Sequence, residues 1–263
     1  MKFMTNSFET VLDKFRLDGK TAIVTGASRG LGQGMAIGLA EAGANIVAAS
    51  TRKENLAETE QIIRSLGKEV VSLACDVTDD QQIQNTIDTA FDKFAGIDIL
   101  VNNAGTIRRA LAEDYSDEDW DVVINTNLNA VFKFCKKAGK IMIKQKSGKI
   151  INIASLLSFS GGITVPAYAA SKGGVAQLTK ALANEWAKYN IQVNAIAPGY
   201  FATDNTKKLR EDPVRNRQIS ERIPAGRWGV PADLQGAVVF LASGASDYVN
   251  GHILLVDGGW MAR

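Results

Sequence analysis

The residues of this chain that could do chemistry stand at fixed spacing: Ser155, then Tyr168, then Lys172. On a helix, the Tyr-x-x-x-Lys spacing places both side chains on one face, where the ammonium can stabilise the ionised phenol. A free phenol has a pKa of about 10, and a neighbouring cation lowers that pKa toward neutral pH, where proton exchange is efficient. The spacing predicts that Tyr168 is an acid/base, although an exposed helical pair has the same pattern.

A glycine-rich turn lies far upstream, in Thr25-Gly-Ala-Ser-Arg-Gly-Leu-Gly32. It follows the apolar run 21–25 and leads into a helix-like segment, 33–42. A strand, a glycine turn and a helix N-terminus together direct backbone N–H groups and the positive end of a helix dipole toward a pyrophosphate. The spacing G-x-x-x-G-x-G is a variant of the common dinucleotide fingerprint. Taken alone, it also fits a tight strand–helix connection that binds nothing.

Strand-like and helix-like segments alternate along the chain and must position these residues. Apolar strand-like runs fall at 21–25, 46–50, 70–75, 97–101, 150–154 and 191–196. The alternation predicts an α/β fold: a Rossmann-like, doubly wound parallel sheet flanked by helices on both faces. With 263 residues, 46% of them hydrophobic, the chain can form one domain, 1–263. Within it we expect an N-terminal extension, 1–16, and a mobile substrate lid, 203–225, which is polar and interrupted by proline.

Composition excludes several classes of protein. The formal net charge is only +2, and the aromatic residues do not alternate with basic ones, so we expect no nucleic-acid partner. The first 16 residues carry Lys2, Glu9 and Asp13, which fits neither a signal peptide nor a membrane span and predicts a cytoplasmic protein. A single histidine with Cys75 and Cys135 cannot form a zinc shell. We therefore expect no metal, and two reduced core cysteines.

Further motifs follow in a fixed order: Asn102-Asn-Ala-Gly105, Asn127, and Pro198-Gly199. Together with the glycine turn and with Ser155, Tyr168 and Lys172, they make the chain resemble the short-chain dehydrogenase/reductase family. The resemblance runs from about residue 17 to the C-terminus and is carried by all of these motifs jointly. It implies an NAD(P)-dependent oxidoreductase that acts on a CH–OH group.

The resemblance implies a catalytic role for each of four residues. Tyr168 would exchange a proton with the substrate oxygen, and Ser155 would hydrogen-bond the same oxygen. Lys172 would tune Tyr168 and bind the nicotinamide ribose, and Asn127 would hold a water that links Lys172 to solvent. The alternative for Ser155 is an ordinary hydroxyl at a strand end, and for Asn127 a backbone-bonded amide inside a helix.

The same resemblance implies a cofactor site, with NAD as the expected cofactor. Its expected residues are Gly26, Ser28, Arg29, Gly30, Leu31, Gly32, Ser50, Arg52, Asp76, Val77, Asn103, Ala104, Gly105, Tyr168, Lys172, Pro198, Gly199, Phe201 and Thr203. An acid after the second strand would hydrogen-bond the adenosine ribose, whereas a basic residue would accept a 2′-phosphate. This chain has Ser50 where NAD-dependent members often carry Asp, followed by Arg52 and Lys53. NADP is therefore open as well, unless both basic residues belong to a solvated loop.

Several runs resemble the sugar-acid branch of the family. They include Thr106-Ile-Arg-Arg109, Leu156 to Gly162, Gly199 to Asn205, Arg222 to Trp228, and Asp257-Gly-Gly-Trp260. The resemblance implies a keto or hydroxy sugar acid of uronate catabolism as the substrate. Its carboxylate would suit an arginine fork. We expect Arg108 to be that clamp, together with Ser155 and Tyr168 as substrate residues; the rivals are Arg109, Arg222, Arg227 and a purely surface role.

Other functions stay open at this point. Gluconate 5-dehydrogenase and 3-oxoacyl-carrier-protein reductase share the catalytic set, and a lysine run could dock an acidic carrier protein if it is not simply a solvated helix face. That run comprises Lys133, Lys136, Lys137, Lys140 and Lys144. A non-catalytic nicotinamide-binding regulator is the alternative from another class. The resemblance also implies a homotetramer formed through two long helices, 118–144 and 168–188. An apolar stripe on the second helix fits such an interface, but it fits packing on the sheet equally well.

Overall fold

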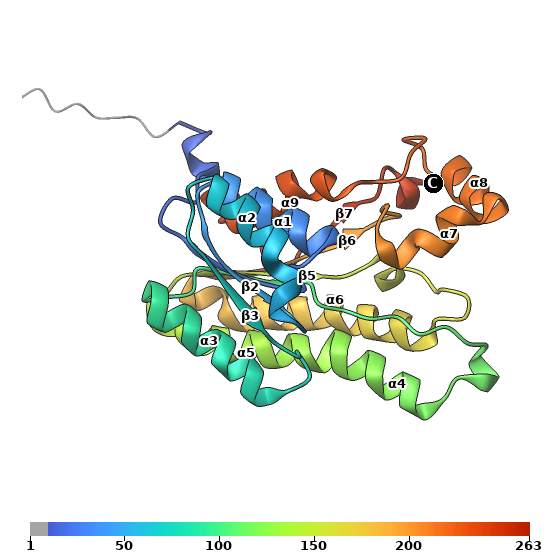
Figure 1. Ribbon diagram of the computed structural model, residues 1–263, viewed down its shortest axis with the longest axis horizontal. Helices are drawn as coiled ribbons and strands as arrows, with labels where there is room; N and C mark the ends of the chain where they lie inside the picture. Colours follow the sequence, from blue (N-terminus) through green and yellow to red (C-terminus); the bar gives the residue numbers. More distant parts are fainter. Residues whose placement is uncertain (1–9) are drawn as a thin grey trace, which may run out of the picture.

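Seven parallel strands form one sheet at the centre of the molecule (Figure 1). The structure is a computed structural model that describes residues 10–263, so most of the predicted N-terminal extension lies outside the described residues. The strands lie in the order β3-β2-β1-β4-β5-β6-β7. Their bounds are β1 Thr21–Thr25, β2 Asn45–Ser50, β3 Val70–Ala74, β4 Ile99–Asn102, β5 Gly148–Ile153, β6 Ile191–Pro198 and β7 Ile253–Val256. The predicted doubly wound parallel sheet is confirmed.

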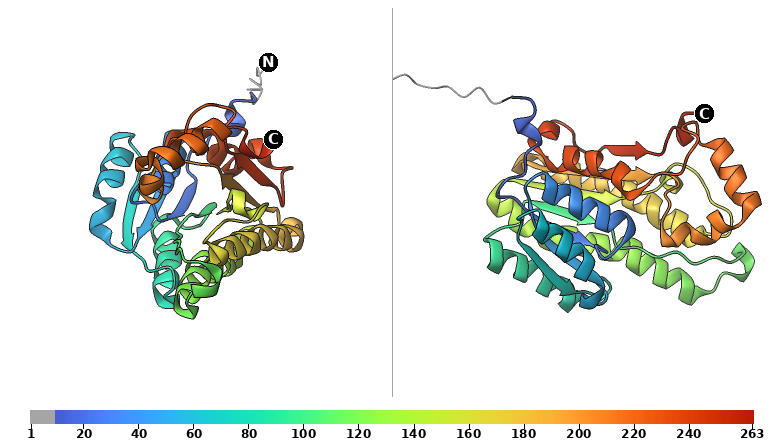
Figure 2. Two further views of the ribbon diagram at one scale, coloured as in Figure 1. Left: turned by 90° about the vertical axis from the view of Figure 1, so that its right-hand side faces the viewer. Right: turned by 45° about the horizontal axis from the view of Figure 1, so that its top comes forward.

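Helices cover both faces of this sheet. In Figure 1, α1, α2 and α9 lie above it and α3, α5 and α6 lie below it, and Figure 2 shows the same layers end-on. These six helices are α1 Gly30–Glu41, α2 Ala57–Ser65, α3 Asp80–Phe94, α5 Ala130–Gln145, α6 Pro166–Trp186 and α9 Gln235–Ala242. Each face therefore has its own core, one packed against α3, α5 and α6 and the other against α1, α2 and α9.

The apolar strands follow from this double coverage. All five residues of β1 and all eight of β6 are buried, as expected of central parallel strands with helices on both sides. The helix boundaries have equally local causes. Asp79 begins α3 by accepting hydrogen bonds from the backbone N–H groups of Gln81 and Gln82, and Pro166 occupies the first turn of α6, where its missing N–H costs nothing.

The sheet reverses its strand order between β1 and β4, which are hydrogen-bonded neighbours. At such a switch point the chain leaves the two strands in opposite directions, so a crevice forms beyond their carboxyl ends. The glycine turn follows β1, and the Asn102-Asn-Ala-Gly105 motif follows β4. The topology thus brings two motifs that are remote in sequence to one edge.

Two predicted helical regions differ in detail from the structure. The long helix expected over 118–144 consists of α4 (Asp117–Ile124), one π-helical turn (Asn125–Asn129) and α5. The predicted lid contains two short helices, α7 (Lys207–Glu211) and α8 (Pro213–Arg222), which lie beside the C-terminus in Figure 1. Within residues 10–263, no helix combines the length and the apolar character needed to cross a membrane.

Candidate active site

A cleft of about 1540 Å³ opens at the carboxyl edge of the sheet. Its walls come from the glycine turn, the residues that follow β2 to β6, the start of α6 and the lid. Six basic side chains line it, against two acidic ones, Asp76 and Asp204. Since the whole chain carries a formal net charge of only +2, the positive charge gathers in this cleft, which favours anionic ligands.

Ser155 stands just beyond the end of β5. Its Oγ accepts a hydrogen bond from the Leu157 N–H at 3.2 Å, and its own N–H donates to Ser158 Oγ at 3.3 Å. The Ser158 hydroxyl in turn donates to the carbonyl oxygen of Lys172 at 2.7 Å. These bonds fix Ser155 against α6, the helix that carries Tyr168 and Lys172.

Tyr168 and Lys172 lie one turn apart on α6, as their spacing predicted. Lys172 Nζ lies 5.7 Å from the centre of the Tyr168 ring and donates a 2.5 Å hydrogen bond to the carbonyl oxygen of Ile153. The lysine is buried, and this desolvation lowers its pKa to about 8.

Burial also raises the pKa of Tyr168. The Ser155 hydroxyl and the positive charge of Arg109 act in the opposite direction, but burial outweighs them. The net direction is therefore the reverse of the lowering that the Tyr-x-x-x-Lys spacing led us to expect. Tyr168 is therefore a neutral phenol at neutral pH, which is the form that can donate a proton.

Asn127 lies in the π-helical turn between α4 and α5 and is fully buried. Its Oδ1 accepts from the Thr106 N–H at 2.8 Å, and its Nδ2 donates to the Thr106 carbonyl at 2.9 Å and to Ser171 Oγ at 3.2 Å. The amide therefore joins the segment after β4 to the residue next to Lys172. Asn127 does not itself line the cleft.

The glycine turn forms a cradle for a group that approaches the backbone closely. Gly26 and Gly30 have φ angles of +65° and +57°, which side-chain-bearing residues rarely adopt. A Cβ at Gly32 would collide with the carbonyl oxygen of Gly26 and with Asn103 Nδ2. No side chain caps the start of α1, so its first N–H groups face the turn. These features fit the pyrophosphate of a dinucleotide.

Thr25 and Asn103 lock this cradle to the neighbouring strand. The Asn103 side chain donates to the carbonyl oxygens of Thr25 at 2.9 Å and Gly26 at 3.1 Å. Thr25 Oγ1 accepts from the N–H groups of Asn103 and Ala104, both at 3.0 Å. The two motifs at the switch point thus form one hydrogen-bonded unit.

The end of β2 offers hydroxyl groups instead of a carboxylate. Ser50 Oγ donates to the carbonyl oxygen of Arg52 at 2.6 Å, and Ser50 and Thr51 both line the cleft. The Arg29 guanidinium lies 3.2 Å from the carboxylate of Asp204 in the lid. A dinucleotide with or without a 2′-phosphate therefore meets no fixed acid at this point of β2.

Most residues predicted from the sequence come together here. The cleft is lined by Gly26, Ser28, Arg29, Gly30, Leu31, Gly32, Ser50, Asp76, Val77, Asn103, Ala104, Gly105, Arg108, Ser155, Tyr168, Lys172, Pro198, Gly199 and Thr203. Arg52 lies outside the lining and is exposed. Phe201 is buried beneath the cleft, because its ring packs against Gly229.

Other lining residues were not singled out as site residues. They include Ser160, the loop 161–165, Gln218 and Trp260. The periodicity of apolar residues along a helix could not predict them. Ser160 and 161–165 lie in the loop before α6, Gln218 lies in α8, and Trp260 lies near the C-terminus. The resemblance to the sugar-acid branch pointed to the runs 156–162 and 257–260, which contain Ser160 and Trp260, but it gave no signal for Gln218.

The candidate clamp Arg108 lines the cleft but already has a partner. Its Nε lies 3.2 Å from Asp119 Oδ1, and its Nη1 donates to Thr106 Oγ1 at 2.9 Å. Arg227 is bound to both carboxylate oxygens of Asp233, at 2.7 and 2.8 Å, and lies outside the lining. Of the four candidate arginines, Arg109 and Arg222 line the cleft without an ion pair. Arg215 in α8 also lines the cleft without an ion pair, but it donates a hydrogen bond to Gln218 Oε1 at 3.0 Å.

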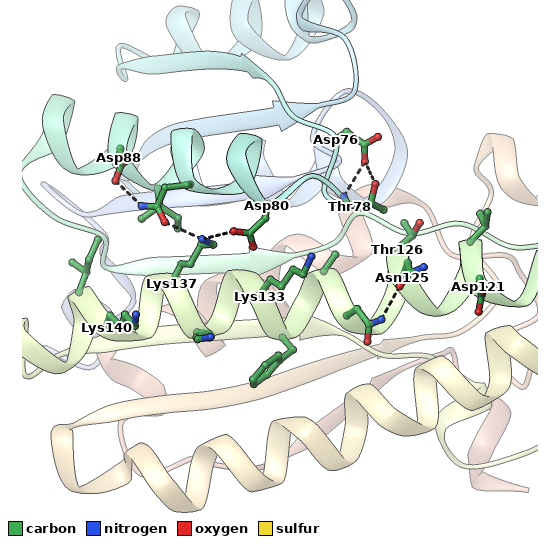
Figure 3. Close-up of a pocket in the computed structure, with 18 of the residues that line it drawn as sticks. Asp76, Thr78, Asp80, Asp88, Asp121, Asn125, Thr126, Lys133, Lys137 and Lys140 are labelled. Carbon is green, nitrogen blue, oxygen red and sulfur yellow. Dashed lines mark hydrogen bonds and ion pairs between the residues drawn. The ribbon is translucent and has the colours of Figure 1, made fainter.

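A second hollow of about 1250 Å³ lies between α3 and the α4–α5 segment (Figure 3). It contains four of the lysines considered as a carrier-protein dock, Lys133, Lys136, Lys137 and Lys140. Lys137 Nζ is held 3.0 Å from both Asp80 and Gln84. Five acidic side chains share this lining: Asp76, Asp80, Asp88, Glu118 and Asp121. The mixed charge does not favour an acidic partner.

Neither cysteine forms a disulfide, and both are buried. Burial raises the pKa of Cys135 to about 12, so its thiol is inert at neutral pH. Within the described residues, no three histidine, cysteine, aspartate or glutamate side chains gather in a way that could hold a metal ion. The cleft itself brings together a phenol, a hydroxyl, an ammonium and several guanidinium groups.

Comparison with known proteins agrees with this geometry. A family model described as Enoyl-(Acyl carrier protein) reductase matches residues 26–261. The 2-dehydro-3-deoxy-D-gluconate 5-dehydrogenase of Escherichia coli is 55% identical over 254 residues, which cover 96% of this chain and 100% of the relative. The Bacillus subtilis protein of the same name is 55% identical over 251 residues, covering 95% and 98%.

A solved structure extends the likeness to three dimensions. The gluconate 5-dehydrogenase of Burkholderia cenocepacia, in complex with NADP and tartrate, superimposes with a TM-score of 0.92. It is 43% identical, and the match covers 97% of this chain and 100% of that chain. With its motifs, its cleft and these near full-length matches, the chain belongs to the short-chain dehydrogenase/reductase family.

Proposed function

We propose that this chain is a nicotinamide-dependent dehydrogenase that acts on a keto-deoxy sugar acid, with 2-dehydro-3-deoxy-D-gluconate oxidised at C5 as its substrate. The observation that carries the proposal is one cleft that joins Ser155, Tyr168 and Lys172 to a dinucleotide cradle and to an excess of basic side chains. The identity of more than half with full-length relatives of that name supports the substrate.

We infer that the cofactor is NAD or NADP, held by the residues of the glycine cradle and by Lys172. A bound nicotinamide dinucleotide supplies or accepts the hydride. The protein's part is then to hold the substrate oxygen and to move its proton. The NADP in the Burkholderia relative supports the phosphorylated form, and the hydroxyl groups at the end of β2 admit either form.

Tyr168 is the proposed proton carrier, and Ser155 the proposed partner of the same substrate oxygen. In the reductive direction the neutral phenol donates its proton to the alkoxide as it forms. In the oxidative direction the ionised phenol must accept the hydroxyl proton, and nearby positive charge from Lys172 and Arg109 stabilises that form. Asn127 is a proposed positioning residue, since it joins the segment after β4 to Ser171 beside Lys172.

The alternatives receive less support. A carrier-protein reductase would gain from a basic docking face, but four of the five lysines of the run line a groove of mixed charge. Gluconate 5-dehydrogenase activity is the second candidate, since a relative of that name shares the fold. The homotetramer and the cytoplasmic location stay predictions. The homotetramer is supported by two large apolar side chains that are exposed on the predicted interface helices, Trp120 on α4 and Phe132 on α5.

The test is a steady-state assay of the purified protein with NAD and with NADP, following reduced nicotinamide by its absorbance. The substrates are 2-dehydro-3-deoxy-D-gluconate and D-gluconate in the oxidative direction and an acetoacetyl thioester in the reductive direction. Preferred turnover of the keto-deoxy acid supports the proposal. Turnover of gluconate alone would shift the assignment to gluconate 5-dehydrogenase, and turnover of the thioester alone would reject a sugar acid altogether.

A further inference from the structure

Arg222 ends α8, and its guanidinium lies over the Trp260 ring, which forms an aromatic shelf at the wall of the cleft. Its guanidinium carbon is 4.0 Å from the centre of the Trp260 ring, and both residues line the cleft. The guanidinium is exposed, and among residues 10–263 it forms no ion pair and no hydrogen bond. Stacking on an aromatic face fixes the plane of an arginine and leaves its N–H edge free.

The shelf itself is rigid. Trp260 is only 8% exposed and packs with Leu156, Ile219 and Ile223. The turn that presents it is held by Asp257, whose carboxylate oxygens accept from the N–H groups of Gly259 at 2.8 Å and Met261 at 2.9 Å. Tyr200 supports the indole from another side, with ring centres 4.6 Å apart.

The C-terminus also joins the shelf to α8. Arg263 donates to the carbonyl oxygen of Glu221 at 2.8 Å, and this carbonyl lies in the last turn of the helix, where intrahelical partners are missing. Figure 1 and the right-hand view of Figure 2 both show the C-terminus beside α8. Trp260 and Arg222 are therefore held as one unit, although they are 38 positions apart in the sequence.

This unit lies next to the reacting end of the cleft. Leu156, which packs in the same cluster as Trp260, directly follows Ser155. A sugar acid that presents C5 to Ser155 and Tyr168 carries its carboxylate four carbon–carbon bonds away, each about 1.5 Å long. The substrate carboxylate is then expected at a wall of the cleft beyond Ser155, away from the Tyr168 phenol.

Arg109 also lines the cleft, and its positive charge acts against the rise in the pKa of the Tyr168 phenol. A carboxylate bound to Arg109 would cancel this effect and place a negative charge near the phenol, where ionisation is already opposed by burial. Arg108 and Arg227 are bound to Asp119 and Asp233, so an incoming carboxylate would have to displace a protein carboxylate there.

Resting on the proposed function, we infer that Arg222, held over the Trp260 ring, binds the carboxylate of the substrate and makes the enzyme select acids over neutral sugars. A guanidinium presents two parallel N–H donors to a carboxylate, which gives both affinity and orientation. Trp260 is the positioning residue of this pair.

The test compares two substrates that differ in one group. 3-Deoxy-D-fructose has the carbon chain of 2-dehydro-3-deoxy-D-gluconate, with CH₂OH in place of the carboxylate. We expect Arg222→Gln to lower kcat/KM for the acid by about tenfold or more, the loss of one charge-assisted hydrogen bond, mainly through KM. For 3-deoxy-D-fructose, kcat/KM should stay nearly unchanged.

Arg217→Gln is the matched control, because Arg217 lies on the same helix, pairs with Glu221 at 2.7 Å and does not line the cleft. It should leave the discrimination between the two substrates intact. Trp260→Leu should weaken discrimination as Arg222→Gln does, whereas Trp260→Phe, which keeps an aromatic face, should restore part of it.

The outcomes separate this inference from the proposed function. If the wild type oxidises the acid and Arg222→Gln discriminates as the wild type does, the inference is overturned and the proposed function stands. Loss of discrimination in Arg109→Gln but not in Arg222→Gln would overturn it in favour of Arg109. A wild type that does not oxidise the acid would overturn both.

Discussion

Lys172 lies with its ammonium nitrogen 5.7 Å from the centre of the Tyr168 ring, while its hydrogen bond goes to the carbonyl oxygen of Ile153 at 2.5 Å. The lysine therefore makes no hydrogen bond to the phenol and acts on it only through space. Since burial raises the pKa of Tyr168 and lowers that of Lys172, both groups are held closer to their neutral forms. A ligand that brings negative charge into the cleft would raise the pKa of the lysine again.

We expect Tyr168→Phe to lower kcat by about 10²- to 10⁴-fold, the usual contribution of general acid/base catalysis. The ring and its packing remain, so only the ionisable hydroxyl is lost. The dissociation constant of the cofactor, measured by titration of tryptophan fluorescence, should change little. Unchanged turnover would remove Tyr168 from the chemistry and would favour a nicotinamide-binding protein without catalysis at this position.

The pKa of about 8 for Lys172 predicts a pH dependence of cofactor affinity. Below pH 8 the lysine is protonated and can donate charge-assisted hydrogen bonds to the cofactor; above pH 8 the free protein must take up a proton to do so. The affinity for NAD should therefore be constant up to about pH 8 and then fall by up to about tenfold per pH unit.

NAD is the better probe of this effect, because it lacks the 2′-phosphate, whose second proton titrates near pH 6. Lys172→Met is the control, and its weaker affinity should show no transition near pH 8. A wild-type affinity that stays constant to pH 10 would mean that Lys172 does not bind the cofactor through its charged form.

Gly32→Ala should abolish cofactor binding and destabilise the fold, because its Cβ would collide with the Gly26 carbonyl and the Asn103 amide. The matched control is Gly236→Ala, another helical glycine, around which a Cβ meets nothing within 4 Å. That change should stabilise the protein by about 0.5–1 kcal/mol. Urea unfolding and cofactor titration of both variants check the prediction, and it fails if Gly32→Ala binds the cofactor normally.

The sequence predicted the sheet well because central parallel strands are buried on both faces. The run expected at 21–25 is β1 itself, and the run at 191–196 lies within β6. Such strands are continuous apolar segments between turn residues, and this pattern is local. The same holds for the glycine turn and for Tyr168 and Lys172, whose chemistry depends on spacing along one segment.

Other features depend on contacts between distant segments and could not be predicted in this way. Asn102 donates to Asn152 Oδ1 at 2.8 Å inside the core, and Asn152 donates to Thr179 on α6 at 3.0 Å. This buried chain joins β4, β5 and α6, but no spacing in the sequence reveals it. The contacts of the arginines also emerge only from the folded chain: Arg222 lies over Trp260, 38 positions away, and Arg227 pairs with Asp233 across the turn that precedes α9.

Ser50 offers a test of cofactor choice. It lies at the end of β2, lines the cleft and donates its hydroxyl to the Arg52 carbonyl at 2.6 Å. A carboxylate at this position would accept hydrogen bonds from the adenosine ribose of NAD and would repel the 2′-phosphate of NADP. Ser50→Asp should therefore lower the ratio of kcat/KM for NADP to that for NAD by about tenfold or more, since one unfavourable charge contact costs at least about 1.4 kcal/mol.

Ser50→Asn, which matches the shape without the charge, should shift the ratio much less. Equal shifts in the two variants would show that shape, and not charge, decides between the cofactors, and an unchanged ratio in both would mean that the adenosine ribose lies elsewhere in the cleft.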